Sequence, residues 1–141
     1  NIFMIIDFRG RAKKAIREDV ESALWFAKNE LMPRHRKLFI TVHLIKDLRK
    51  KEGVHGDVLD EDDREYAMRI DSSQARTELI STVLHEMVHV YQYATRKMTQ
   101  PSGDIIVYDK TEYPWDMEYD QKPWEIEAHN LERDLYDNFY K

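Results

Sequence analysis

The chain has 141 residues, the length of one ordinary domain, and its 42% hydrophobic content, with three Trp, eight Tyr and five Phe, excludes a disordered polymer. Its net charge of −5 arises from mixed signs along most of the chain, which does not indicate a dominant phosphate-binding face but is compatible with a local basic patch. The absence of cysteine excludes disulfides and thiolate metal sites and leaves His and carboxylate side chains as the strong ligands for zinc.

The longest apolar run, Ile2 to Ile6, is far too short to span a bilayer, and no signal-peptide pattern precedes it. We therefore expect a cytoplasmic protein that makes no membrane contact.

The first half of the chain predicts one helix and two strands. Apolar residues recur at helical spacing from Ala12 to Leu31, and Pro33 marks the end of that helix. The β-branched run from Leu38 to Leu48 predicts a strand. The charged stretch from Arg49 to Asp63 contains two glycines and predicts a loop or an exposed hairpin tip. The alternating segment from Glu65 to Ile70 predicts a second, shorter strand.

The second half predicts two helices separated by an irregular region. Asp71, Ser72 and Ser73 offer an N-cap to a long helix that runs to about Met98, and the Pro-Ser-Gly sequence at 101–103 breaks it. Residues 105–108 predict a short strand, and residues 111–122 an aromatic and acidic irregular segment. Pro123 begins a final helix in the first-turn position that proline tolerates. The element order predicts a compact α+β domain that spans residues 1–141.

The most informative motif is His85-Glu86-Met87-Val88-His89, which lies within the long predicted helix. Because 3.6 residues make one turn, the two histidines lie one above the other, and both rings can reach one metal ion. Glu86 projects about 100° around the helix from His85, so we expect it to act as a general base rather than as a ligand. The competing interpretation is a pair of surface histidines, but the helix is otherwise apolar around the motif.

The final helix offers three candidates for a third ligand: Glu125, Glu127 and His129. Glu125 and Glu127 differ by about 200° around a helix, so both cannot serve one ion, whereas Glu125 and His129 share a face. Helical position alone does not choose among them, because the two glutamates flank the apolar stripe of this helix on opposite sides.

An HExxH motif that is followed by Glu-x-x-Ala on a later helix resembles the gluzincin zinc peptidases. The matching run is Glu125-Ile126-Glu127-Ala128, so the resemblance implies that zinc is held by His85, His89 and Glu125. In many gluzincins an Asp four residues after this Glu orients a ligand histidine. This chain has His129 at that position, which leaves the orienting role open and keeps His129 as a rival ligand.

The segment around His85 to Gln92 also resembles the SprT-like family, although the nearby third histidine of that family is missing. The chain is similar to minigluzincins and ImmA-type peptidases as well. With its Pro-Trp-Glu-Ile-Glu-Ala run, it looks most like the small SprT-like metallopeptidases of tailed bacteriophages. The resemblance covers roughly residues 60–140.

This resemblance implies a zincin-like domain with a small antiparallel or mixed sheet, an active-site helix and a C-terminal ligand-bearing helix. The implied function is a monomeric zinc endopeptidase in the cytoplasm, that of the host cell if a phage encodes the chain. It would hydrolyse polypeptides through a metal-activated water, with Glu86 as the general base. The alternative is a non-catalytic or latent zinc-binding module acting in protein or DNA-associated interactions. A nucleic-acid partner has no support in the 141 residues, which carry neither a zinc ribbon nor a basic tail.

Zincins commonly place an edge strand before the active-site helix, against which substrate lies. Arg64 to Ile70 matches that element, although an ordinary sheet edge explains it equally well. Gluzincin-like sites also use a Tyr or His to stabilise the oxyanion, and Tyr108, Tyr113 and Tyr119 are the candidates. Of the remaining histidines, we expect His43 in the sheet or core, and His35 and His55 at the surface.

Overall fold

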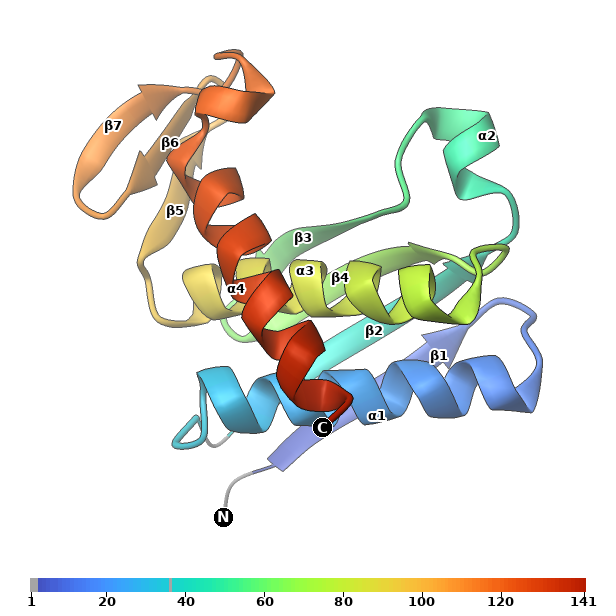
Figure 1. Ribbon diagram of the computed structural model, residues 1–141. Helices are drawn as coiled ribbons and strands as arrows, with labels where there is room; N and C mark the ends of the chain where they lie inside the picture. Colours follow the sequence, from blue (N-terminus) through green and yellow to red (C-terminus); the bar gives the residue numbers. More distant parts are fainter. Residues whose placement is uncertain (1–2, 36) are drawn as a thin grey trace.

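A four-stranded mixed sheet forms the base of the structure, a computed structural model that describes residues 3–35 and 37–141 (Figure 1). Its strand order is β1-β2-β4-β3, in which β1, β2 and β4 are parallel and β3 pairs antiparallel with β4. The strands are β1 (Phe3–Arg9), β2 (Lys37–Ile45), β3 (Gly56–Asp62) and β4 (Glu65–Asp71). The observed class is α+β, as predicted.

Three long helices complete the domain: α1 (Lys14–Leu31), α3 (Arg76–Ala94) and α4 (Pro123–Phe139). Helices α1 and α3 lie side by side on one face of the sheet, and α4 crosses α3 (Figure 1). Alternate residues of β2 are buried beneath them, namely Leu38, Ile40, Val42 and Leu44. Burial of side chains of this size stabilises the fold by about 1.5–3 kcal/mol each, so the position of α3 is firmly fixed.

A smaller antiparallel sheet follows α3 and consists of β5 (Met98–Ser102), β6 (Ile105–Tyr108) and β7 (Thr111–Pro114). It has an apolar cluster of its own, in which Met98, Ile106 and Tyr108 pack against Trp124 of α4. A single 3₁₀ turn, η1 (Tyr119–Gln121), joins this sheet to α4. We call β5, β6, β7 and η1 the aromatic lobe. Among the residues that the structure describes, no helix is long and apolar enough to cross a membrane.

For residues 49–63 the sequence predicts a loop or an exposed hairpin tip. The loop is wrong, because this segment contains the short helix α2 (Leu48–Glu52) and the strand β3, which forms an antiparallel hairpin with β4 that turns at residues 63–64. The acidic sequence of β3 conceals its strand character, since most of its side chains are exposed and only its backbone pairing with β4 defines it. Its Asp57 also accepts two hydrogen bonds from the guanidinium of Arg69 in β4, which fixes the strand pair.

The predicted edge strand is also wrong in its assignment. The segment Arg64 to Ile70 lies almost entirely in β4, which is paired with β2 on one side and β3 on the other. The strand at this edge of the sheet is therefore β3, and any extended chain that joins the sheet beside α3 must pair with β3.

Other elements also differ from the predictions: α3 ends at Ala94 rather than near Met98, and Met98–Ser102 form the strand β5. Helix α3 begins at Arg76, and Asp71 does not cap it. The carboxylate of Asp71 instead accepts hydrogen bonds from the backbone N–H groups of Ser73 and Arg49, at 2.8 and 3.0 Å. The N-terminal apolar run is part of β1, and the segment 111–122 contains β7 and η1. The predicted α1, β4, β6 and α4 agree with the structure to within about two residues.

Candidate metal centre

Helix α3 holds the three ionisable residues of the HExxH motif in an almost fully buried position. His85, Glu86 and His89 are 8%, 6% and 7% exposed. The helix is buried on nearly every side from Leu79 to Val90 because it lies between the sheet, α1 and α4. The two imidazole rings stand one turn apart, with their centroids separated by 5.0 Å. Ionisable groups are seldom buried without partners, so each of these three must be accounted for.

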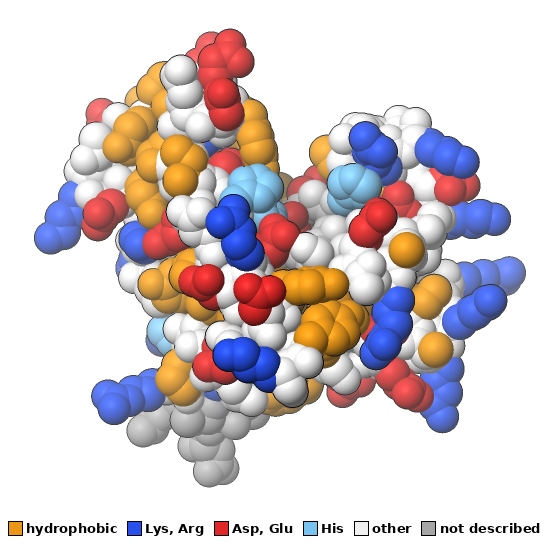
Figure 2. Space-filling view, viewed as in Figure 1, with side chains coloured by type: hydrophobic (Ala, Val, Ile, Leu, Met, Phe, Trp, Pro, Cys, Tyr) orange, Lys and Arg blue, Asp and Glu red, His pale blue; other side chains and the backbone are white. Residues whose placement is uncertain are grey.

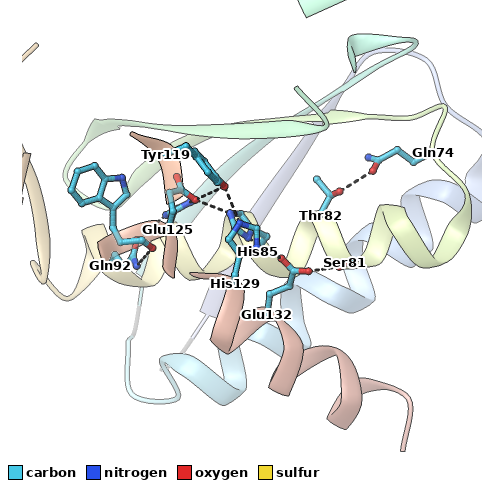
Figure 3. A network of polar contacts seen from close by, with 11 residues as sticks. Gln74, Ser81, Thr82, His85, Gln92, Tyr119, Glu125, His129 and Glu132 are labelled. Atoms are coloured by element: carbon cyan, nitrogen blue, oxygen red, sulfur yellow. Dashed lines mark hydrogen bonds and ion pairs between the residues drawn. The ribbon is translucent and has the colours of Figure 1, made fainter. Parts of the chain in front are cut away.

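Glu125, in the first turn of α4, reaches both histidines of the motif with one oxygen, and Figure 3 shows it beside His85. Its Oε1 atom lies 3.0 Å from His85 Nε2 and 3.1 Å from His89 Nε2. His85, His89 and Glu125 each offer one ligand atom, and these three atoms lie within 4.8 Å of one another. Donors around a tetrahedral zinc ion lie about 3.3–3.4 Å apart, given bond lengths of about 2.0–2.1 Å. The separations of Glu125 Oε1 from the two histidine nitrogens are therefore within a few tenths of an ångström of those around a tetrahedral zinc ion.

The other two candidates for the third ligand occupy different surroundings. Glu127 contacts Gln92 of α3, from whose Nε2 it accepts a hydrogen bond at 2.9 Å, and it pairs with Lys97. His129 is exposed, and its ring lies 4.6 Å from that of His85. It belongs to a second cluster with His85 and Glu132 that satisfies the same distance criterion. That cluster lacks His89, so only the Glu125 cluster uses both histidines of the motif.

Glu132 orients His85, a role that the sequence analysis did not assign. The Nδ1 atom of His85 lies 2.8 Å from Glu132 Oε1, and the hydroxyl of Ser81 donates to the other carboxylate oxygen. This bond turns Nε2 of His85 toward Glu125. The carboxylate comes seven residues after Glu125, two helical turns along the same face, so a search for acids at i+7 as well as i+4 finds it.

Gln92 has the corresponding role for the second histidine. His89 Nδ1 lies 2.7 Å from Gln92 Oε1, and Gln92 Nε2 donates to the backbone carbonyl of Trp124 at 3.0 Å and to Glu127. The side chain of Gln92 is completely buried. It therefore fixes the ring of His89 and ties α3 to the start of α4.

The charges in this cluster shift one another's pKa values. Burial alone would lower the pKa of His85, but hydrogen bonds to Glu125 and Glu132 outweigh it and raise the pKa to about 10. Burial would raise the pKa of Glu125, but hydrogen bonds from the two histidines hold it well below its usual range. Burial raises the pKa of Glu86 to about 7, against the opposing charges of His89 and His85. The raised pKa of His85 and the lowered pKa of Glu125 favour a charged pair, and because a ligand histidine must be neutral, protons would compete with any metal ion for this cluster.

Of the three tyrosines considered for the oxyanion, Tyr119 alone contacts the cluster. Its hydroxyl donates to Glu125 Oε1 at 3.0 Å and lies 3.0 Å from His129 Nε2. Tyr108 and Tyr113 instead pack against Trp124 in the aromatic lobe. The other histidines lie outside the cluster: His43 is in β2, His35 is half-buried rather than exposed, and His55 is exposed as expected.

A cleft of about 820 Å³ opens over the cluster. Its floor is the outward face of α3, one wall is the segment Gly53–Val58, and the opposite wall comes from η1 and α4. The space-filling view shows a deep notch between the aromatic lobe and the part that carries α2, with histidine side chains on both sides of it (Figure 2). The candidate centre is therefore buried but reachable, as a reactive site must be.

Comparisons of the chain with protein-family models, with curated proteins and with solved structures found no match.

Proposed function

We propose that the chain is a metal-dependent peptidase, specifically a zinc endopeptidase. The observation that carries the proposal is the convergence of His85, His89 and Glu125 at the bottom of an open cleft, with the buried Glu86 beside them. Two imidazoles and one carboxylate form a donor set typical of catalytic zinc, which keeps a further position open for water or substrate. When bound, such an ion lowers the pKa of its water toward neutrality and polarises the carbonyl of the scissile bond.

Glu86 is the general base in this proposal. Its pKa of about 7 in the metal-free site lies near the operating pH, which favours proton transfer in both directions. Beside a cation held by His85, His89 and Glu125, the carboxylate of Glu86 would be ionised before attack. Glu86 takes one proton from the attacking water, whose oxygen bonds to the carbonyl carbon. It then delivers that proton to the departing amine as the C–N bond breaks.

Tyr119 is the proposed donor to the oxyanion. Its ring is about half exposed in the cleft wall, and its hydroxyl already lies within hydrogen-bond distance of Glu125. A small rotation would turn the O–H from the carboxylate toward the carbonyl oxygen of a substrate beside it. A donor at this position stabilises charge that develops only in the transition state.

The edge strand β3 offers a surface for the substrate backbone. Within the part of the chain that the structure describes, no strand pairs with β3 on the side that faces the cleft, so an extended peptide can add to the sheet there through main-chain hydrogen bonds. This mode suits a polypeptide substrate and leaves side-chain selection to the pockets of the cleft.

The substitution Glu86→Gln tests the proposal, with Glu21→Gln on the exposed face of α1 as the matched control. Glu86→Gln should bind zinc like the wild type but lose about 10²- to 10⁴-fold in cleavage of an unfolded protein or a peptide library. The control should keep both properties. Equal cleavage by the Glu86 variant would refute its assigned role. Stoichiometric zinc without cleavage by the wild type would instead favour a non-catalytic module.

A further inference from the structure

The two ends of the cleft differ in chemical character. Residues of α3 that face it follow helical spacing from Glu78 through Thr82, His85 and His89 to Tyr93. The candidate metal centre lies midway along this row. A peptide bound across the centre would therefore contact the surface near Glu78 on one side and the surface near Tyr93 on the other.

The end near the start of α3 is polar and acidic. Glu78 is exposed there and has no ion-pair partner among residues 3–35 and 37–141. Two other acids line the cleft near this end and already have partners: Asp57 pairs with Arg69, and Glu132 is bonded to Ser81 and His85. Gln74, Ser81 and Thr82 supply the remaining polar lining. Glu78 is thus a free negative charge at this end.

The opposite end is aromatic. Trp115 is 46% exposed although it is a large apolar side chain, and it lies in the cleft wall with Met98, Trp124 and Tyr93. Nζ of Lys122 lies 4.2 Å from the centroid of the Trp115 ring, which holds that ring in place by a cation–π contact. An exposed tryptophan beside a reactive centre provides a surface on which an apolar side chain can be buried.

The direction of β3 decides which end of the cleft receives the N-terminal part of a bound peptide. Gly56, the first residue of β3, lies so close to Thr82 that a Cβ atom placed there would be 2.8 Å from its Cγ2 atom. Strand β3 therefore starts at the acidic end and runs in the same direction as α3 (Figure 1). Antiparallel pairing is the more stable and more frequent arrangement. A peptide paired in that way enters with its N-terminal part at the aromatic end.

We infer that the cleft selects polypeptides with a large apolar or aromatic residue on the carbonyl side of the scissile bond and a Lys or Arg on the amine side. Trp115 would contact the first side chain, and Glu78 the second. The inference rests on the proposed peptidase function and adds a substrate class to it.

A peptide library randomised on both sides of the scissile bond tests the inference, with the wild type, Glu78→Gln and Trp115→Ala digested in parallel. Glu78→Gln should reduce the preference for Lys and Arg on the amine side about fivefold and leave the carbonyl side unchanged. Trp115→Ala should reduce the preference for large apolar residues on the carbonyl side about tenfold or more and leave the amine side unchanged.

Two controls match the substitutions: Glu21→Gln on α1, and Ile126→Ala, which removes an exposed apolar side chain of α4 outside this cleft. The Trp115 variant should fold, because the hydrogen bond between Trp115 and Asp104 joins backbone atoms and does not need the indole side chain. Cleavage without either preference, or with the two preferences on the reversed sides, would overturn the inference.

Binding separates this inference from the proposed function. Peptides of the selected sequence, and the same peptides with the two flanking residues exchanged, are titrated into zinc-loaded wild type and Glu86→Gln. Tighter binding of the selected order without any cleavage by the wild type would support the cleft assignment and refute the peptidase. Cleavage with equal binding of both orders would do the reverse.

Discussion

The substitution Glu132→Gln tests how strongly metal affinity depends on Glu132, which contacts the proposed ligand His85 but is not itself a proposed ligand. The amide has the same size as the carboxylate and can still accept a hydrogen bond from His85 Nδ1, now 2.8 Å from Glu132 Oε1. What is lost is the charge. A hydrogen bond to a charged group contributes about 1.5–3 kcal/mol, against about 0.5–1.5 kcal/mol for a neutral pair.

The difference of about 1–1.5 kcal/mol corresponds to about a tenfold loss of metal affinity, since 1.4 kcal/mol changes an equilibrium constant tenfold. The same substitution weakens the hold of His85 on a proton, which competes with the metal ion. We therefore expect the lower end of the range of about 10- to 100-fold that is usual for partners of this kind.

Competition with a chromophoric chelator at a fixed pH measures the affinity, and far-ultraviolet circular dichroism verifies the fold. The control is Asp134→Asn, which makes the same change of charge at an exposed position of α4. An affinity within twofold of the wild type, or an equal loss in the control, would show that Glu132 does not support His85.

Two further predictions concern the same cluster. Tyr119→Phe keeps the ring but removes the O–H, so kcat should fall about 10- to 100-fold with little change in KM, and an unchanged kcat would limit Tyr119 to packing. In the metal-free protein, the pKa of His85 is raised from 6.5 to about 10. The stability that it contributes is complete below pH 6.5 and is lost as the pH rises toward 10, so Tm measured with a chelator should fall over this range. A Tm that stays constant from pH 6.5 to 10 would contradict the proposed protonation of His85.

The helices were predictable because their apolar residues recur every three or four positions and face a single core. The motif helix α3 and the start of α4 at Pro123 follow directly from that pattern. The strands were less predictable where burial does not alternate. Strand β3 has an acidic sequence that predicts a loop or a hairpin tip, and it forms an antiparallel hairpin with β4 that turns at residues 63–64. The partner strand is local in sequence, but β3 lacks the alternation of buried and exposed side chains that predicts a strand.

In the candidate site too, local spacing predicted some residues, whereas the packing of one helix on another decided the rest. The spacing of His85 and His89 indicates a shared face, and the structure brings both histidines to Glu125. Helical geometry left Glu125 and Glu127 as alternatives, because the crossing of α4 over α3 decides which side faces the cluster. Gln92 carried no signal of its own, since its role depends on the carbonyl of Trp124 in another helix.

Titration of the metal-free chain with zinc, while cleavage of a reporter peptide is followed, tests the central claim most directly. Cleavage should rise in proportion to added zinc and stop rising at one equivalent per chain, in the wild type and in Glu127→Gln alike. Glu125→Gln should show neither tight binding nor cleavage over that range. Cleavage that is independent of zinc, or one bound equivalent without cleavage by the wild type, would contradict the account.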